Sequence, residues 1–357
     1  MNPNELLFFT AFIGFIVGTL LLDLGVFSRK SHVVSFREAA IWSCIWVTFA
    51  IIFYFVLKSY GHYIHGIQTF DDLEIVVNKY VDDVGNLSYY KADDPERSIQ
   101  SYRENMALEF ITGWLLEYSL SVDNIFVIIL IFSSFGVKEN YFKKVLLWGI
   151  LGAVVMRFIF IFLGAALIQK FGFILYFFGA LLIYSGIKML IADEDEKFET
   201  DKHPIVKLSS RFFQVFPRYV KDRFFVMKKG KIFITPLFVV VLIVEFTDLL
   251  FAVDSVPAVF AVTIDPYVVF FSNIFAIMGL RSMFFFLSNV MHLFHYLKTG
   301  LAFLLTFIGI KMIAHDWFKL IGFKNEYSLY IILGILVISV LASVIFPQPK
   351  EKEAVSV

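Results

Sequence analysis

The chain has 357 residues, of which 59% are hydrophobic and 18% aromatic, and 45 of them are phenylalanine. This composition lies outside the range of soluble domains and is typical of an integral membrane protein, so we expect a lipid bilayer around it. Its 31 basic and 31 acidic residues balance, which excludes the strongly basic character of nucleic-acid-binding proteins. A single cysteine, Cys44, excludes an intramolecular disulfide and a Cys-x-x-Cys site, and we expect a buried, inert thiol.

Nine apolar stretches are long enough to cross a hydrocarbon core about 30 Å thick. They predict an all-α membrane protein with about nine transmembrane helices, near residues 6–27, 39–57, 107–133, 145–169, 171–192, 233–262, 267–290, 299–316 and 327–346. No basic residues precede the first stretch and no cleavage site is evident, so we expect a retained helix rather than a signal peptide.

The charges between these stretches predict the orientation of the helices. Lys and Arg gather between the first and second stretches, between the third and fourth, and in the segment 193–232, whereas the segment 58–105 is acidic. Because basic loops stay in the cytoplasm, we expect the N-terminus outside and the C-terminus inside.

The acidic segment 58–105 contains the turn-forming runs 82–86 and 93–95, which predict a small hairpin with a solvated face. Two histidine pairs, at 62 and 65 and at 292 and 295, have a spacing that can place both rings on one helix face. Without a third ligand close by, we expect surface histidines rather than a metal site.

Carboxylates lie inside two of the apolar stretches. Glu117 and Asp123 lie in 107–132, and Glu245, Asp248 and Asp254 lie in 234–262. An ionised group at the bilayer centre costs about 2.5–3.5 kcal/mol on insertion scales, so these acids are expected to face the protein interior or a wet cavity. They are the candidate functional site.

The two acidic stretches also repeat one another. Asp123 follows Glu117 by six positions, as Asp254 follows Asp248, and later matching segments are offset by 124 and 123 positions. This pattern predicts two three-helix repeats, and an odd number of helices makes the two copies cross the membrane in opposite senses. The expected division is a two-helix segment 1–57, an extracytoplasmic loop 58–105, repeat 1 at 106–192, a cytoplasmic linker 193–232, repeat 2 at 233–316, and a last helix with a tail at 317–357.

Helical geometry orders the polar residues of the repeats. Positions seven apart share a helix face, so Glu117 lines up with Asn124, and Asp248 with Ser255. The second aspartate of each repeat lies about 100° away and would align only where the helix is locally unwound, for which Pro257 offers a cause. The predicted metal site consists of Asp123, Asp254, Glu117, Glu245, Asp248, Asn124 and Ser255.

These side chains offer only oxygen donors, which suit Mn²⁺, with Ca²⁺ or Mg²⁺ as alternatives, better than Zn²⁺ or Cu⁺. We therefore expect a transported divalent cation, protons as the counter-ion, and no organic cofactor. The alternative is that the acids form static buried pairs with Arg157, Arg281, Lys188 and Lys311. Both lysines lie near span ends and are expected to reach the interface, which leaves two deep arginines for five acids.

Several motifs resemble the TerC/Alx family of bacterial membrane proteins. They are Glu-Tyr-Ser-Leu-Ser-Val-Asp-Asn at 117–124, Glu-Phe-Thr-Asp at 245–248, Phe-Ala-Val-Asp-Ser-Val-Pro-Ala at 251–258, the segments 23–27, 151–157 and 272–276, and two Gly-Ile-Lys-Met runs. The resemblance implies an inner-membrane fold of the lysine-exporter superfamily type, Mn²⁺ efflux and an association with tellurium resistance. Tyr118, where a basic residue is expected, and a longer outer loop depart from the family pattern.

Three classes of function compete. The leading hypothesis is a secondary transporter that exports Mn²⁺, with the acids as ligands or proton carriers. The second is a membrane scaffold that supplies metal to exported proteins or assists their assembly through the outer loop, with protein partners that the sequence does not identify. An intramembrane metalloenzyme is disfavoured, since the chain has no His-Glu-x-x-His motif and no convincing nucleophile and base beside the acids, so we expect no enzymatic activity.

Overall fold

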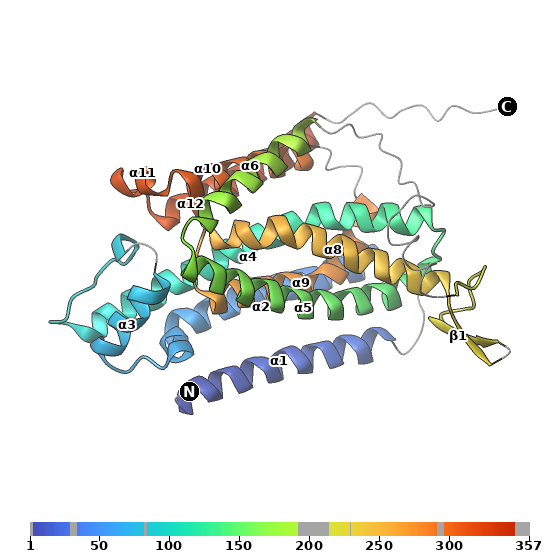
Figure 1. Cartoon of the computed structure of the whole chain (residues 1–357), viewed down its shortest axis with the longest axis horizontal. Helices are drawn as coiled ribbons and strands as arrows, with labels where there is room; N and C mark the ends of the chain where they lie inside the picture. The colour runs from blue at the N-terminus through green and yellow to red at the C-terminus, as the bar shows by residue number, and fades with distance from the viewer. Residues whose placement is uncertain are drawn as a thin grey trace.

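The computed structural model describes residues 3–28, 34–81, 84–191, 214–228, 230–290 and 296–346, without the side chains of 3–5 and 20–28. The second histidine pair, at 292 and 295, and most of the predicted linker lie outside the described residues. The described part is a helical bundle with one small β-hairpin (Figure 1).

The first half of the bundle precedes the linker. Its elements are α1 (Pro3–Ser28), α2 (Phe36–Tyr60), η1 (Gly61–His65), α3 (Phe70–Tyr80), η2 (Val84–Asn86), α4 (Pro95–Ser134), α5 (Glu139–Lys170) and α6 (Ile174–Ile191). The second half comprises β1 (Phe225–Lys228), β2 (Lys231–Ile234), α8 (Pro236–Phe260), α9 (Pro266–Val290), α10 (Leu297–Ile313), α11 (His315–Leu320) and α12 (Asn325–Ile345). Each predicted span coincides with one of these helices.

Seven helices within the described residues are long and apolar enough to cross a membrane: the one that includes α2, and α4, α5, α6, α8, α9 and α12. Two further helices fall below this length. α10 has 17 residues, and the apolar part of α1 covers Leu6–Thr19. The multi-pass helical architecture predicted from composition is therefore confirmed at the level of seven spans.

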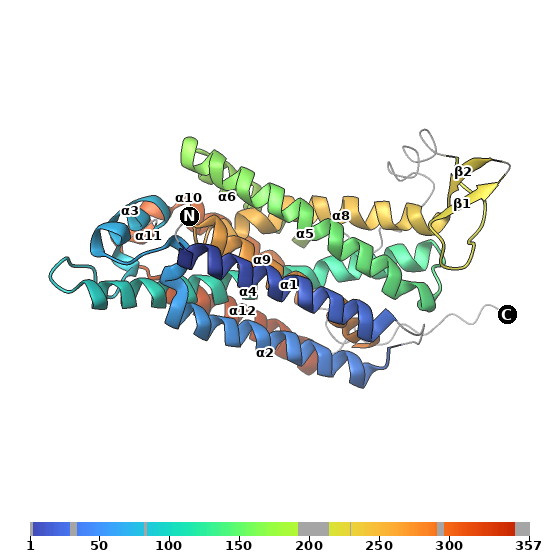
Figure 2. The same cartoon turned by 90° about the horizontal axis from the view of Figure 1, so that it is seen from below.

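The helices run between two ends of the molecule. α3 lies at one end, here called the α3 end, and the β1–β2 hairpin lies at the other, the hairpin end (Figures 1 and 2). α4 begins at the α3 end and α8 begins at the hairpin end, so these two helices run in opposite directions. α9 is almost wholly buried, and its contacts with α2, α4 and α5 place it at the centre.

Aromatic rings fill the core between α1, α2 and α9. The Phe12 and Phe271 ring centroids are 4.4 Å apart in an edge-to-face pair, and those of Phe53 and Phe275 are 4.7 Å apart in a stacked pair. Such pairs add about 0.5–1.5 kcal/mol beyond the burial of their area, so the high phenylalanine content builds this packing. Cys44 on α2 is exposed, so the predicted buried thiol is wrong.

α6 and α10 pack closely because glycine faces backbone at their contact. A Cβ on Gly179 would lie 2.9 Å from the carbonyl oxygen of Gly309, and one on Gly309 would lie 2.6 Å from that of Gly179. Gly186 likewise faces Thr306 and the carbonyl of Ala302. Small residues let membrane helices approach and gain van der Waals contact, which lipid does not otherwise favour.

The segment between α2 and α4 is helical rather than the predicted hairpin. Thr69 caps α3: its hydroxyl accepts from the Asp72 backbone N–H while the Asp72 carboxylate accepts from the Thr69 N–H. The Thr69 hydroxyl also donates to the Asp72 carboxylate at 2.9 Å, and this bond first, with those from the backbone N–H groups of Thr69 and Gln68, holds the pKa of Asp72 below its usual range. Asp94 then caps α4, whose 40 residues extend for about 60 Å, well beyond the thickness of a hydrocarbon core. The extra turns of α4 support residues 61–94, which we call the outer module after the side of the membrane predicted for them.

α8 is continuous to Phe260, so the local unwinding predicted at Pro257 is wrong. Pro257 lies only three residues before the helix end, where its own carbonyl accepts from Ala261. Proline usually kinks or breaks a helix in the turn that precedes it, but here the residues of that turn remain helical. α4 is also unbroken through both of its predicted site acids.

Candidate functional site

Arg157 of α5 is the centre of a buried polar cluster. Its side chain is fully buried, and one guanidinium nitrogen, Nη1, forms an ion pair with Glu117 of α4. The same nitrogen donates to Oδ1 of Asn273 on α9 at 2.7 Å, and Nη2 lies 3.4 Å from Oδ1 of Asp248 on α8. Four helices therefore meet at one guanidinium.

The cluster combines one cation with two acids. Glu117 is fully buried, while the side chain of Asp248 keeps 13% of its exposure. A buried charge is tolerated only when an opposite charge compensates it, and Arg157 supplies the ion pair for Glu117. The predicted pairing of these acids with a deep arginine is thus found at Arg157. Its counterpart Arg281 borders a small cavity beside Trp42 and Trp46 of α2.

Further buried polar atoms on α4 and α8, in the Arg157 cluster and up to two helical turns from it, have no hydrogen-bond partner among the described residues. They are Oε2 of Glu117, Oγ of Ser121, Nδ2 of Asn124, Oδ2 of Asp248 and Oγ of Ser255. Four of these five side chains belong to the predicted site. A buried polar group without a partner costs about 1–3 kcal/mol, so several of them along two helices call for a ligand or a function.

Glu245 lies one turn before Asp248 on α8 and faces α5. A Cβ on Gly152 would overlap the Glu245 carboxylate, so the glycine makes room for this acid between the helices. The charge of Asp248 acts on Glu245, so these two acids are neighbours on α8. Glu245 therefore borders the Arg157 cluster.

The second aspartate of each predicted repeat lies apart from Arg157. Asp254 accepts a 2.8 Å hydrogen bond from Ser185 of α6 and lies near the charge of Lys188. Asp123 is partly buried, and Lys298 at the start of α10 is a nearby positive charge. Among the described residues, no group of three or more His, Cys, Asp or Glu side chains is arranged to hold a metal ion. The seven predicted residues are therefore not gathered around one point.

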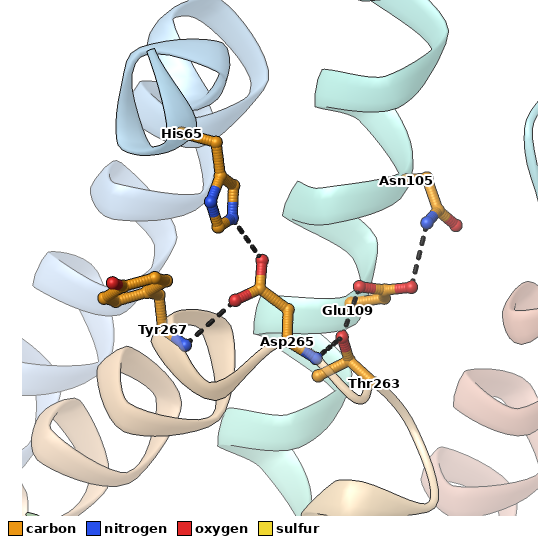
Figure 3. A network of polar contacts seen from close by, with 6 residues as sticks. All are labelled: His65, Asn105, Glu109, Thr263, Asp265 and Tyr267. Carbon is orange, nitrogen blue, oxygen red and sulfur yellow. Dashed lines mark hydrogen bonds and ion pairs between the residues drawn. The ribbon is translucent and has the colours of Figure 1, made fainter. Parts of the chain in front are cut away.

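A second polar network lies at the α3 end, and none of its residues was among those predicted for the metal site (Figure 3). Glu109 of α4 accepts from Asn105 at 2.8 Å and from Thr263 at 2.6 Å. His65 of η1 lies 2.7 Å from Asp265, and its side chain is 6% exposed, so the predicted surface position of this histidine is wrong. Glu109 lies inside the apolar stretch 107–132, and the rule that flagged Glu117 applies to it as well.

Lys311, which was expected to reach the membrane interface, instead forms contacts inside the protein beside this network. Lys311 of α10 donates to the carbonyl oxygen of Ala261 at 3.2 Å and approaches Oδ1 of Asn325 at 3.5 Å. The side chain is partly buried and ties α10 to the end of α8 and the start of α12. It therefore belongs to the network at the α3 end.

The bundle and its charged centre define a multi-pass α-helical integral membrane protein with a polar site buried at the level of its apolar helices. The chain belongs to the integral membrane protein TerC family, whose model matches residues 102–351. The match begins in α4 and includes every predicted site residue.

The chain is also similar over most of its length to individual bacterial proteins. It is 40% identical over 334 residues to an uncharacterized membrane protein of Myxococcus xanthus, which covers 94% of this chain and 91% of that protein. It is 38% identical to Alx of Salmonella typhi (95% and 94%) and to Alx of Escherichia coli K12 (90% and 88%), whose name assigns a provisional role as a membrane-bound redox modulator. No solved structure shows a significant match.

Proposed function

We propose that this protein is a secondary transporter that exports a divalent cation, Mn²⁺ first, through the polar site between α4 and α8. The observation that carries the proposal is the row of side chains along these two helices that each hold a buried polar atom without a hydrogen-bond partner among the described residues, those of Glu117, Asn124, Asp248 and Ser255. An Mn²⁺ ion would meet the oxygens of this row one after another on its way through, since it prefers hard donors, and Ca²⁺ or Mg²⁺ would compete. The unpartnered Asn124 nitrogen and the carbonyl oxygen of the same amide can exchange places by a flip of that group.

Cation binding would have to displace Arg157 from the acids that it pairs with. Its guanidinium neutralises part of the charge of Glu117 and Asp248, and a divalent cation held by the same carboxylates would displace it. The cation and the guanidinium are both positive, and they repel strongly at this depth because little water screens their charges. A cation and the guanidinium would therefore occupy the acids in turn, as transport from one side to the other requires.

The opposite directions of α4 and α8 support two inverted three-helix repeats, α4–α6 and α8–α10, with the site at their interface. Transporters with such repeats expose a midplane site to one side and then to the other by movement of one repeat against its partner. In this proposal the protein resides in the bacterial inner membrane with the α3 end outside, and protons move in exchange for the metal.

The alternatives predict different measurements. A scaffold that hands metal to exported proteins would depend on the outer module and would move no ion by itself. The name of the Alx relatives suggests redox activity, but one cysteine cannot form an intramolecular dithiol. A redox role would thus need a partner's thiol or another redox group.

The test is Mn²⁺ flux in proteoliposomes, with Ca²⁺, Mg²⁺ and Zn²⁺ in parallel. Asn124→Ala and Ser255→Ala remove unpartnered neutral groups and leave no buried charge unpaired, so both variants should fold and transport Mn²⁺ about tenfold more slowly or worse. Asp123→Asn and Asp254→Asn are expected to stop flux at normal protein abundance.

Matched controls lie on the same two helices. Ser119→Ala on α4 and Thr247→Val on α8 change hydroxyls that already donate to the backbone, at 2.6 Å and 2.7 Å, so they should transport at the unmodified rate. Absence of Mn²⁺ flux by the unmodified protein would refute the transporter. Equal losses in the controls and the site variants would move the ion path away from the α4–α8 interface.

A further inference from the structure

Glu109 is a buried acid whose hydrogen bonds come from neutral groups. Its residue is 7% exposed, and its Oε1 accepts from Asn105 at 2.8 Å and lies 3.5 Å from the Asn325 amide nitrogen. Its Oε2 accepts from the Thr263 hydroxyl at 2.6 Å (Figure 3). The nearest lysine, Lys311, is bonded to Asn325 and Ala261 rather than to the carboxylate itself. The network thus holds a carboxyl group without a direct salt bridge among the described residues.

Glu109 also borders a cavity of about 40 Å³ that reaches the outer module. Thr263 and Asn325 line it together with Asn86 of η2 and the two lysines Lys311 and Lys319. A space of this size exceeds the volume that one water needs, and its polar lining offers hydrogen bonds. Two ammonium groups at its wall disfavour a divalent cation inside it. Water and protons can therefore reach Glu109 where Mn²⁺ is excluded.

The Thr263 hydroxyl can serve either protonation state of Glu109. A hydroxyl donates one proton and accepts at two lone pairs, and one lone pair is taken by the Asp265 backbone N–H at 3.3 Å. When Glu109 is ionised, the hydroxyl donates a hydrogen bond to its carboxylate. When Oε2 carries the proton, the hydroxyl accepts a hydrogen bond from Oε2 and turns its own hydrogen toward the cavity that Thr263 borders. Two unpartnered buried groups lie close by, Oδ1 of Asn105 and the hydroxyl of Tyr102.

We infer that Glu109 is the proton-binding residue of the counter-ion path, loaded from the α3 end through this cavity. The inference rests on the proposed exporter and assigns the group that carries its coupling ion. One proton from the solution at the α3 end is relayed by a cavity water, which takes up one proton as it gives another to Oε2, so that a carboxylic acid forms and the water stays neutral. The proton leaves later toward the other end of the molecule as the metal moves out. Glu109 lies eight residues, or about 12 Å, before Glu117 on the same helix, so the two sites are adjacent but separate.

The experiment follows both ions in proteoliposomes, with a metal-quenched dye for Mn²⁺ and a pH-sensitive dye for protons. Glu109→Gln keeps the shape of the side chain and cannot exchange a proton. We expect its Mn²⁺ affinity to stay unchanged, its Mn²⁺-driven proton movement to fall about tenfold or more, and its Mn²⁺ flux to lose its response to an imposed pH gradient. Glu104→Gln, on the same helix but exposed and paired with Lys58, is the matched control and should behave as the unmodified protein.

Infrared difference spectra give a readout that needs no transport. Adding Mn²⁺ to the unmodified protein should change the carboxylic acid C=O band, and Thr263→Val, which leaves the carboxyl group in place, should shift that band. Proton coupling retained by Glu109→Gln, or an unmodified protein that moves Mn²⁺ without protons, would overturn the inference and leave the exporter intact. Loss of Mn²⁺ affinity in Glu109→Gln would make the residue a metal ligand and also overturn it. If Glu109→Gln does not fold, an unshifted band in Thr263→Val overturns the inference and a shifted band supports it.

Discussion

At the scale of the residue, Arg157 decides how the buried acids behave. Glu117 is fully buried and depends on this one guanidinium for its ion pair, while Asn273 accepts a hydrogen bond from the same guanidinium nitrogen. Removing one partner of a buried pair leaves an uncompensated charge and costs about 3–5 kcal/mol, whereas removing both costs far less. Substitutions in this pair can therefore separate the contribution of Arg157 to stability from the contribution of Glu117 to transport.

We predict that Arg157→Gln destabilises the protein by about 3–5 kcal/mol and lowers its abundance in the membrane. The double variant Glu117→Gln with Arg157→Gln should recover most of this stability, because no charge is left unpaired, and should still fail to transport Mn²⁺. Thermal unfolding in detergent, together with abundance by immunoblot, measures both effects. A double variant as unstable as Arg157→Gln would show that Glu117 does not depend on this pair.

At the scale of the element, the contact between α6 and α10 depends on glycine. Gly186 leaves no room for a side chain, because a Cβ there would lie 2.7 Å from the carbonyl oxygen of Ala302. Backbone cannot yield as a flexible side chain can, so a larger residue must separate the helices. Asp254 is hydrogen-bonded to Ser185, the residue before Gly186, and the separation should disturb it as well.

We predict that Gly186→Val destabilises the protein by about 1–3 kcal/mol through overpacking. Gly334→Ala on α12 is the matched control, since nothing lies within 4 Å of a Cβ there, and it should leave the melting temperature unchanged or slightly raised. The measurement is thermal unfolding in detergent. Equal melting temperatures for Gly186→Val and the unmodified protein would mean that α6 and α10 are not in close contact in the membrane.

At the scale of the whole molecule, the two ends differ in what they carry. The outer module and the start of α1 lie at the α3 end, while the β1–β2 hairpin and the end of α12 lie at the other (Figures 1 and 2). This arrangement fits the charge pattern that predicts an outside N-terminus and an inside linker. The sidedness itself remains a prediction.

Cysteine labelling in intact bacterial cells tests it, after Cys44→Ser removes the exposed native thiol. We predict that Asp71→Cys, exposed in the outer module, reacts with a membrane-impermeant thiol reagent in intact cells whose outer membrane admits it. Met227→Cys in the hairpin, at a position 73% exposed, should react only after the inner membrane is opened. The reverse pattern would invert the protein and place the Glu109 cavity on the cytoplasmic side.

The sequence by itself determined the membrane class, the place of the long apolar helices and most of the acids within them. These follow from composition and apolar length, which act locally: a bilayer requires about 20 apolar residues per helix, and any charge within them stands out. Glu117, Asn124, Asp248 and Ser255 were found in this way, and their stripes on α4 and α8 follow from the helical period.

Only the tertiary structure decided which of these residues meet. Arg157 lies between Glu117 and Asp248 because α4, α5 and α8 pack together, while Asp254 faces Ser185 on α6. The apolar stretch around Glu109 could have flagged this acid, but its partner Thr263 lies 154 positions away along the chain. His65 was expected at the surface because its partner Asp265 lies 200 positions away. Periodicity specifies the face of a helix, but the neighbour of that face is set by packing between helices distant in sequence.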